Sequence, residues 1–129
     1  MKHKVRLACL NKIGNLVHSS YYLAIIEIYY FNAKVQKFIE SADKPLRPRI
    51  ARMLELLAKH GNLLGMPYSK ALGGGLFELR IVGILHVRII YAFHYSSIWI
   101  LHGFTKKTAQ MTKHDIEYAR EQLKRLADL

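Results

Sequence analysis

The sequence predicts a single α+β domain with a small antiparallel sheet, and three observations support this fold class. The chain has 129 residues, which suits one domain, and 51% of them are hydrophobic, which is enough to build a core. Apolar residues at helical spacing dominate the first half. Runs rich in β-branched and aromatic residues, separated by short turns, dominate the second half. Helices followed by hairpin-linked strands favour α+β over a doubly wound parallel sheet.

The first strand and helix are expected after a basic N-terminal extension. Residues 1–20 contain no acid and show weak periodicity, so we interpret them as an extension of uncertain structure and place the domain at 21–129. Tyr22–Phe31 alternates and is rich in Ile and Tyr, which predicts a strand. Asn32 can cap a following helix, whose apolar stripe is Val35, Phe38 and Ile39.

A second helix is expected from about Arg49 to His60, after a break at Lys44–Pro48 that contains two prolines. Gly61 is a suitable C-terminal stop. The buried face of this helix would consist of Ile50, Met53, Leu54 and Leu57. Its other face carries Arg49, Arg52 and Lys59, which form either a solvated face or a contact for RNA phosphates or an acidic partner.

The second half predicts three strands and a last helix. Leu63–Gly75 is expected to be a loop. The strands are Leu76–Val82, Leu85–His94 and Ile98–Phe104, with turns at Gly83 and at Ser96-Ser97. Thr112 and Asp115 have capping-box spacing and open a helix whose apolar face is Ile116, Ala119, Leu123 and Leu126. The expected order is therefore β-α-α-β-β-β-α.

Charge and cysteine content narrow the class of protein. The formal net charge is +11 and the pI is about 9.9, which indicates nucleic acid first, an acidic protein second and an anionic membrane surface third. The single cysteine, Cys9, excludes an intramolecular disulfide and a cysteine-rich zinc site. We find no convincing membrane span or signal peptide, so a cytoplasmic protein without membrane contact is expected.

The stretch from Leu79 to His114 contains no acidic residue, yet it is rich in basic ones. The basic residues are Arg80, Arg88, Lys106, Lys107 and Lys113. Cations on a sheet without carboxylates nearby would keep their positive charge unneutralised, which suits phosphate. Lys113, just inside a helix start, is interpreted as solvated surface.

Motifs for other chemistries are missing from the sequence. There is no HExxH, no zinc-like Cys/His spacing, no P-loop after Gly73-Gly74-Gly75 and no Gly-x-Ser-x-Gly elbow. His86 and His94 share a strand face with Arg88, but a metal there would have to tolerate the guanidinium. We therefore expect no metal and no cofactor.

The remaining chemistry is that of cations acting on a phosphodiester. RNA supplies its own nucleophile, the 2′-OH, so a protein needs only to orient it, stabilise the phosphorane and move protons. Arg80, Arg88, Lys106 and Lys107 are the catalytic candidates. The candidates for binding RNA are Lys70, Tyr91, His94 and Phe104. Alternatively, the arginines protect a strand, Glu78 pairs with Arg80, and the aromatic residues pack in the core.

Several residue groups together resemble a known protein family. They are Pro67 with Lys70 and Leu72, the runs Leu76–Arg80 and Val87–Tyr91, His102-Gly103-Phe104 with Lys106-Lys107-Thr108, and Ile116–Ala119. In this order and spacing they resemble the phage-derived HigB-like branch of the RelE/ParE toxin superfamily, over about residues 24–129.

The resemblance implies a RelE-like toxin encoded beside an acidic antitoxin. It implies metal-independent cleavage of mRNA on the ribosome, with a 2′,3′-cyclic phosphate as product, and it places Arg80, Arg88, Lys106 and Lys107 where the family keeps basic active-site residues. A strong general base is not obvious, and His94 and Lys106 are the candidates. The superfamily also contains gyrase poisons, so a non-nucleolytic toxin that inhibits DNA gyrase and an inactive basic nucleic-acid-binding module remain as alternatives.

Overall fold

The computed structural model describes residues 3–5, 25–81, 86–106 and 111–129. Its strands are β1 (His3–Lys4), β2 (Ile28–Tyr30), β3 (Ser69–Gly73), β4 (Leu76–Ile81), β5 (His86–His94) and β6 (Ser97–Lys106). Its helices are α2 (Ala33–Glu40), α3 (Arg47–His60), the short 3₁₀ helix η1 (Gly61–Leu63) and α4 (Lys113–Ala127). None of the described helices combines the length and the apolar character needed to cross a membrane.

The six strands form one mixed sheet in the order β1-β2-β6-β5-β4-β3. Neighbouring strands are antiparallel except β2 and β6, which run parallel with Ile28 opposite Ile98. The predicted α+β class is confirmed, but a purely antiparallel sheet and the order β-α-α-β-β-β-α are wrong. The chain returns through α2, α3 and the β3–β6 hairpins, and its last strand then lies alongside β2 in the same direction.

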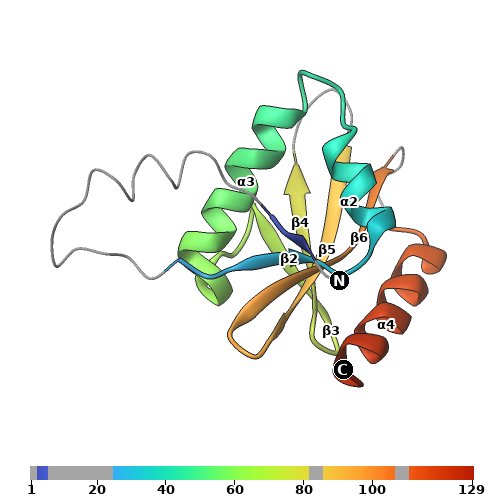
Figure 1. Cartoon of the computed structure of the whole chain (residues 1–129). Coiled ribbons are helices and arrows are strands. Elements are labelled where there is room, and N and C mark those ends of the chain that lie inside the picture. The colour runs from blue at the N-terminus through green and yellow to red at the C-terminus, as the bar shows by residue number, and fades with distance from the viewer. Residues whose placement is uncertain (1–2, 6–24, 82–85, 107–110) are drawn as a thin grey trace, which may run out of the picture.

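Helices cover both faces of the sheet (Figure 1). On one face, α2 and α3 pack Val35, Ile39, Ile50, Leu54 and Leu57 against alternate residues of the central strands. On the other, α4 packs Ala119 and Leu126 against Leu76, Ile90, Ala92 and Leu101. We call the second face the α4 face. The core therefore has two halves with the sheet between them, and a strand residue is assigned to one half by its parity.

Local signals in the sequence fix the helix ends. The Asn32 side chain accepts a hydrogen bond from the Val35 amide, and Thr112 accepts one from the Asp115 amide, so both predicted caps are confirmed. The helix α3 begins at Arg47 rather than Arg49, which places Pro48 in the first turn, where its missing N–H costs nothing.

Two expected non-sheet segments contain strands. Within the expected loop 63–75, residues Ser69–Gly73 form β3, the edge strand paired with β4. Within the expected extension 1–20, His3–Lys4 forms β1, the other edge, and Val5 is buried. Both are short strands that gain their order from a neighbour rather than from their own hydrophobic pattern. The turn expected at Gly83 lies outside the described residues.

The β5–β6 hairpin contains two local irregularities. Tyr95 and Ser96 have φ values of 46° and 64°, which give the two-residue loop the backbone of a tight hairpin turn, one residue earlier than expected. Further along, Ile90 pairs with His102 while Tyr91 pairs with Ile100. Leu101 is therefore an extra residue in β6, a β-bulge, and it changes the parity of every residue after it.

Gly103 is required by close packing between β6 and α2. A Cβ built at Gly103 would lie 2.5 Å from Cδ1 of Phe38, whereas a Cβ at Gly65 would meet nothing within 4 Å. We expect Gly103→Ala to lower the free energy of unfolding by about 1–3 kcal/mol, the usual range for an overpacked site. Urea denaturation measures this, with Gly65→Ala as the matched control. Equal stability of the two variants would contradict the packing.

Candidate functional site

The α4 face brings charged residues from β3, β4 and β5 together with Phe104 and His102 of β6. Arg80 of β4 lies directly opposite Arg88 of β5, which in turn lies opposite Phe104 of β6. In the next row, Lys70 of β3 lies opposite Glu78, which lies opposite Ile90, and Ile90 lies opposite His102. Opposite residues in antiparallel strands are about 4.5–5.5 Å apart, so these two rows form one compact surface.

Glu78 pairs with both arginines. Its Oε1 lies 2.8 Å from Nε of Arg88, and its Oε2 lies 4.0 Å from Nε of Arg80. The expectation that these cations are unneutralised is therefore wrong. Glu78 immediately precedes the acid-free stretch, and register places it between the two arginines. The alternative pairing of Glu78 with Arg80 is present, but the closer contact is to Arg88.

All three side chains of this ion pair are largely buried, so their charges are little screened by water. The side chain of Glu78 is 4% exposed, that of Arg88 is 11% exposed and that of Arg80 is 25% exposed. The close contact is not a directed hydrogen bond, because Glu78 Oε1 and both Nε atoms are buried without a hydrogen-bond partner in the described residues. Charge attraction depends mainly on distance, so we treat the contact as electrostatic pairing that leaves hydrogen-bonding capacity unused.

A histidine–aspartate pair lies beside the arginines. His102 Nε2 is 2.9 Å from Oδ1 of Asp115 in the first turn of α4, and the Thr112 hydroxyl donates to Oδ2 of the same carboxylate. His102 is 9% exposed. It lies diagonally across from Arg88, at the spacing of about 7–8 Å that such neighbours have.

Burial and hydrogen bonding set the protonation states of His102 and Asp115. Burial lowers the pKa of His102 below its ordinary value, and the hydrogen bond that His102 donates to Asp115 opposes this only in part. Burial alone would raise the pKa of Asp115, but the hydrogen bonds from Thr112 and His102 lower it overall. At neutral pH a neutral imidazole therefore donates Nε2–H to a carboxylate, and Nδ1 is left as the acceptor nitrogen.

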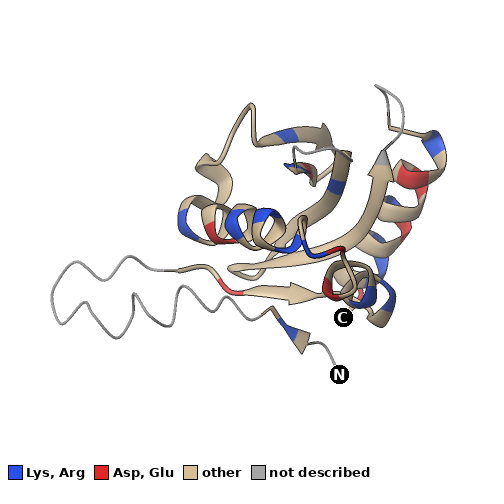
Figure 2. Ribbon diagram, turned by 90° about the horizontal axis from the view of Figure 1, so that it is seen from above, with Lys and Arg blue, Asp and Glu red and all other residues tan. Residues whose placement is uncertain are grey.

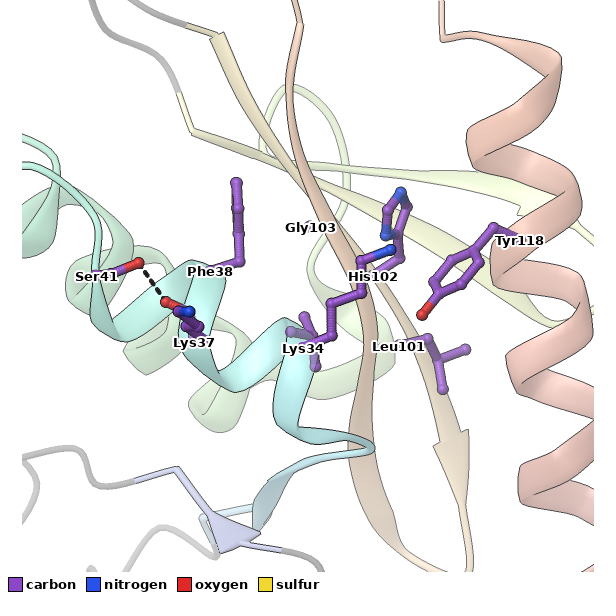
Figure 3. A pocket seen from close by; sticks show the side chains of 9 residues that line it. Lys34, Lys37, Phe38, Ser41, Leu101, His102, Gly103 and Tyr118 are labelled. Carbon is purple, nitrogen blue, oxygen red and sulfur yellow. Dashed lines mark hydrogen bonds between the residues drawn. The ribbon is translucent and has the colours of Figure 1, made fainter.

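Aromatic rings and a pocket surround His102. Its ring stacks on Phe104, with centroids 5.3 Å apart, and contacts Tyr118 of α4 at 4.7 Å. A pocket of about 300 Å³ lies between α2, β6 and α4, and His102 forms part of its wall (Figure 3). Other residues that line it are Lys34, Lys37, Phe38, Ser41, Leu101, Gly103 and Tyr118. The Lys34 ammonium lies 4.5 Å from the centre of the Tyr118 ring, and the figure shows its end beside His102.

Some predicted site residues join this surface and others do not. Arg80, Arg88, Lys70 and Phe104 are brought together, and Lys70 is exposed. Tyr91 is 1% exposed, belongs to the opposite core half and has its hydroxyl 2.6 Å from Ser69 Oγ. Its predicted role in stacking on a base is therefore wrong.

The remaining predicted residues lie at the ends of β5 and β6. His94 is six residues along β5 from Arg88, or about 20 Å at strand spacing, in a pocket with Tyr95 and Trp99. At this distance His94 cannot act as the general base at a phosphate bound by Arg88, and its predicted contact with RNA stays a prediction. Lys106 is the last residue of β6, opposite His86, which places its backbone at the arginine end of the sheet. Lys107 lies outside the described residues.

His102 is the residue of this surface that sequence reasoning missed. Strict alternation along the predicted strand places it on the same face as Ile98 and Ile100, away from the arginines. The bulge at Leu101 reverses this. The one sequence signal for His102 is Asp115 in the first turn of α4, because a partly buried carboxylate beside the sheet favours a hydrogen-bond donor on the nearest strand.

Basic residues also extend beyond this surface. Figure 2 shows Lys and Arg recurring along α3, the helix that contains Arg47, Arg49, Arg52 and Lys59 and has Glu55 as its acid. Glu55 is buried, whereas Arg49 and Arg52 are exposed. The molecule thus presents positive charge on two sides, the α4 face and the outer side of α3.

The fold and this surface define the class of protein. It is a small, strongly basic α+β protein with two arginines paired to a buried glutamate on one sheet face and a histidine–aspartate pair beside them. Residues 37–124, more than half of the chain, match the family described as phage-derived protein Gp49-like (DUF891), and the chain belongs to this family, which is toxin-like. No curated protein matches the chain.

The Glu78–Arg88 pair gives a direct test of the site's architecture. Glu78→Gln removes the negative charge and leaves a guanidinium buried without compensation. We expect a loss of about 3 kcal/mol in the free energy of unfolding. The control is Glu121→Gln, whose pair with Arg125 is 61% and 64% exposed, where about 0–1 kcal/mol is expected. Denaturant unfolding of both variants measures the difference, and equal losses would contradict the role of Glu78.

Proposed function

We propose that the protein is the toxin of a toxin–antitoxin module and cleaves mRNA on the ribosome without a metal ion. The observation that carries this proposal is the pair Arg80 and Arg88, opposite each other on neighbouring strands and held by one buried glutamate. Membership of the toxin-like Gp49 family supports it. The formal charge of +11 suits a polyanionic substrate.

In this proposal the arginines bind the scissile phosphate. Each contacts Glu78 through Nε, so the described residues leave the terminal nitrogens of Arg80 and Nη2 of Arg88 available to phosphate oxygens. Arginine keeps its charge and forms paired hydrogen bonds to phosphate, which suits the additional negative charge of the phosphorane. Fixing the guanidiniums before substrate binds removes part of the cost of organising them in the transition state.

The neighbouring residues complete the RNA contact. Lys70 is exposed on β3 in the row next to Arg80 and adds positive charge for a flanking phosphate. Phe104 lies opposite Arg88 and is half-buried, so a base can stack on its outer side. Lys106 and Lys107 follow Phe104 in the chain, and we assign them to the leaving 5′-oxygen or to proton transfer.

The test compares arginine variants with a distant one. Arg80→Ala and Arg88→Lys are expected to relieve growth arrest and to reduce new mRNA 5′ ends by about 100-fold or more, because each loses preorganised contacts to phosphate. Arg88→Lys keeps a charge beside Glu78, which protects the fold. Arg125→Ala, on an exposed part of α4, should remain as active as the parent.

The readouts are growth after induction and mapping of mRNA 5′ ends. Growth arrest without new 5′ ends would refute the nuclease and favour a toxin of another kind, for which DNA supercoiling and DNA-break assays are the direct tests. Normal growth at high expression of the parent would refute toxicity and favour a basic binding module.

We also propose an acidic protein partner, the antitoxin encoded by the adjacent gene. Exposed cations on α3 and Lys70 on the α4 face provide the complementary charge. Co-expression with the adjacent reading frame should yield a co-purified complex and restore growth, and salt should weaken the complex because exposed charges are screened. A neighbouring product that neither binds nor restores growth would contradict this assignment.

A further inference from the structure

The proposed cleavage needs a group that removes the 2′-OH proton, and the α4 face offers one. A general base must be unprotonated at working pH, oriented by a partner and reachable by the substrate. Among the described residues of this surface, Glu78 is held between two arginines, whereas His102 has an acceptor nitrogen.

Two contacts hold the orientation of His102. Asp115 accepts from Nε2, and the Thr112 hydroxyl in turn fixes the carboxylate of Asp115. The capping box of α4 therefore fixes the imidazole as well as the helix end. A carboxylate in this position selects the tautomer with Nδ1 unprotonated and stabilises the imidazolium once a proton is taken.

The pocket between α2, β6 and α4 gives substrate a route to this buried ring. His102 forms part of its wall, and the pocket volume of about 300 Å³ suits one nucleoside. Phe38 and Tyr118 supply rings, and Lys34 and Lys37 supply positive charge without a carboxylate among the described lining residues. Figure 3 shows Tyr118 and the end of Lys34 gathered around His102.

We propose that His102, oriented by Asp115, is the general base and that the nucleoside bearing the attacking hydroxyl occupies this pocket. The inference rests on the proposed endonuclease. The 2′-OH proton moves to Nδ1 while the 2′-oxygen bonds to phosphorus. The bond from phosphorus to the 5′-oxygen breaks, the 5′-oxygen takes a proton from water, and His102 later releases its proton to solvent. The product is a 2′,3′-cyclic phosphate.

The pH dependence follows from the groups around His102. Burial is the largest influence and lowers its pKa, Lys34 and His114 lower it through their charge, and Asp115 raises it. Arg88 lies diagonally across on β5, and Tyr118 faces the ring from α4. Because the neutral form acts, cleavage should rise with pH through a pKa below the ordinary histidine value and then level off.

The experiment measures single-turnover cleavage of a labelled mRNA bound to purified ribosomes between pH 5 and 8. His102→Gln can still donate to Asp115, and it should lose about 100-fold or more in rate together with the acid limb of the pH profile. Asp115→Asn should lower the rate and move the acid limb to lower pH, because the influence that raises the pKa of His102 is removed. His60→Gln, at the exposed end of α3, is the matched control.

The outcomes separate this inference from the proposed function. If the parent cleaves, Arg88→Lys is impaired and His102→Gln keeps its rate and acid limb, the base assignment is refuted while the nuclease stands. If the parent cleaves no mRNA, both are refuted. Thermal unfolding of each variant shows whether a loss of rate reflects loss of fold. NMR of the imidazole nitrogens in the folded parent should show the Nε2–H tautomer, and the Nδ1–H tautomer would overturn the assignment.

Discussion

The single extra residue at Leu101 is the constraint on which the candidate site depends. It lets Ile100 face α2 and α3 while both Leu101 and His102 face α4. Without this bulge, His102 would lie in the opposite half of the core. Asp115 would then still contact Thr112 at the start of α4 but could not hydrogen-bond to His102. One inserted residue therefore joins the last helix to β6, next to the arginine-bearing strands β5 and β4, both by packing and by a hydrogen bond.

The same three residues of the α4 face, Glu78, Arg80 and Arg88, affect both the stability of the fold and the proposed function. Glu78 is buried, and burying a carboxylate is costly unless cations lie close. The two arginines reduce that cost, and Glu78 in turn balances part of their positive charge. Glu78 Oε1 and both Nε atoms have no hydrogen-bond partner among the described residues, so the cluster is held by charge attraction and not by directed hydrogen bonds.

Sequence patterns predicted most of the fold, because helix caps and alternating strands are local signals. The caps at Asn32 and Thr112 lie where the pattern placed them. Edge strands such as β3 carry little hydrophobic pattern of their own and are specified by their neighbours, so they were missed. The arginines were found because their type is informative by itself. The pairing with Glu78 was noted as an alternative, but His102 was missed because register and a bulge are tertiary properties.

The tight turn at Tyr95-Ser96 influences the position of Arg88, although the two lie far apart, because the turn sets the register in which β5 and β6 pair. The first pair next to that turn is His94 opposite Ser97, and every further pair between β5 and β6 follows from it. A residue added there would advance β6 by one step against β5 and place Arg88 opposite a different neighbour, although the turn lies about 20 Å from Arg88. The length of the hairpin loop thus determines which residue of β6 lies opposite Arg88.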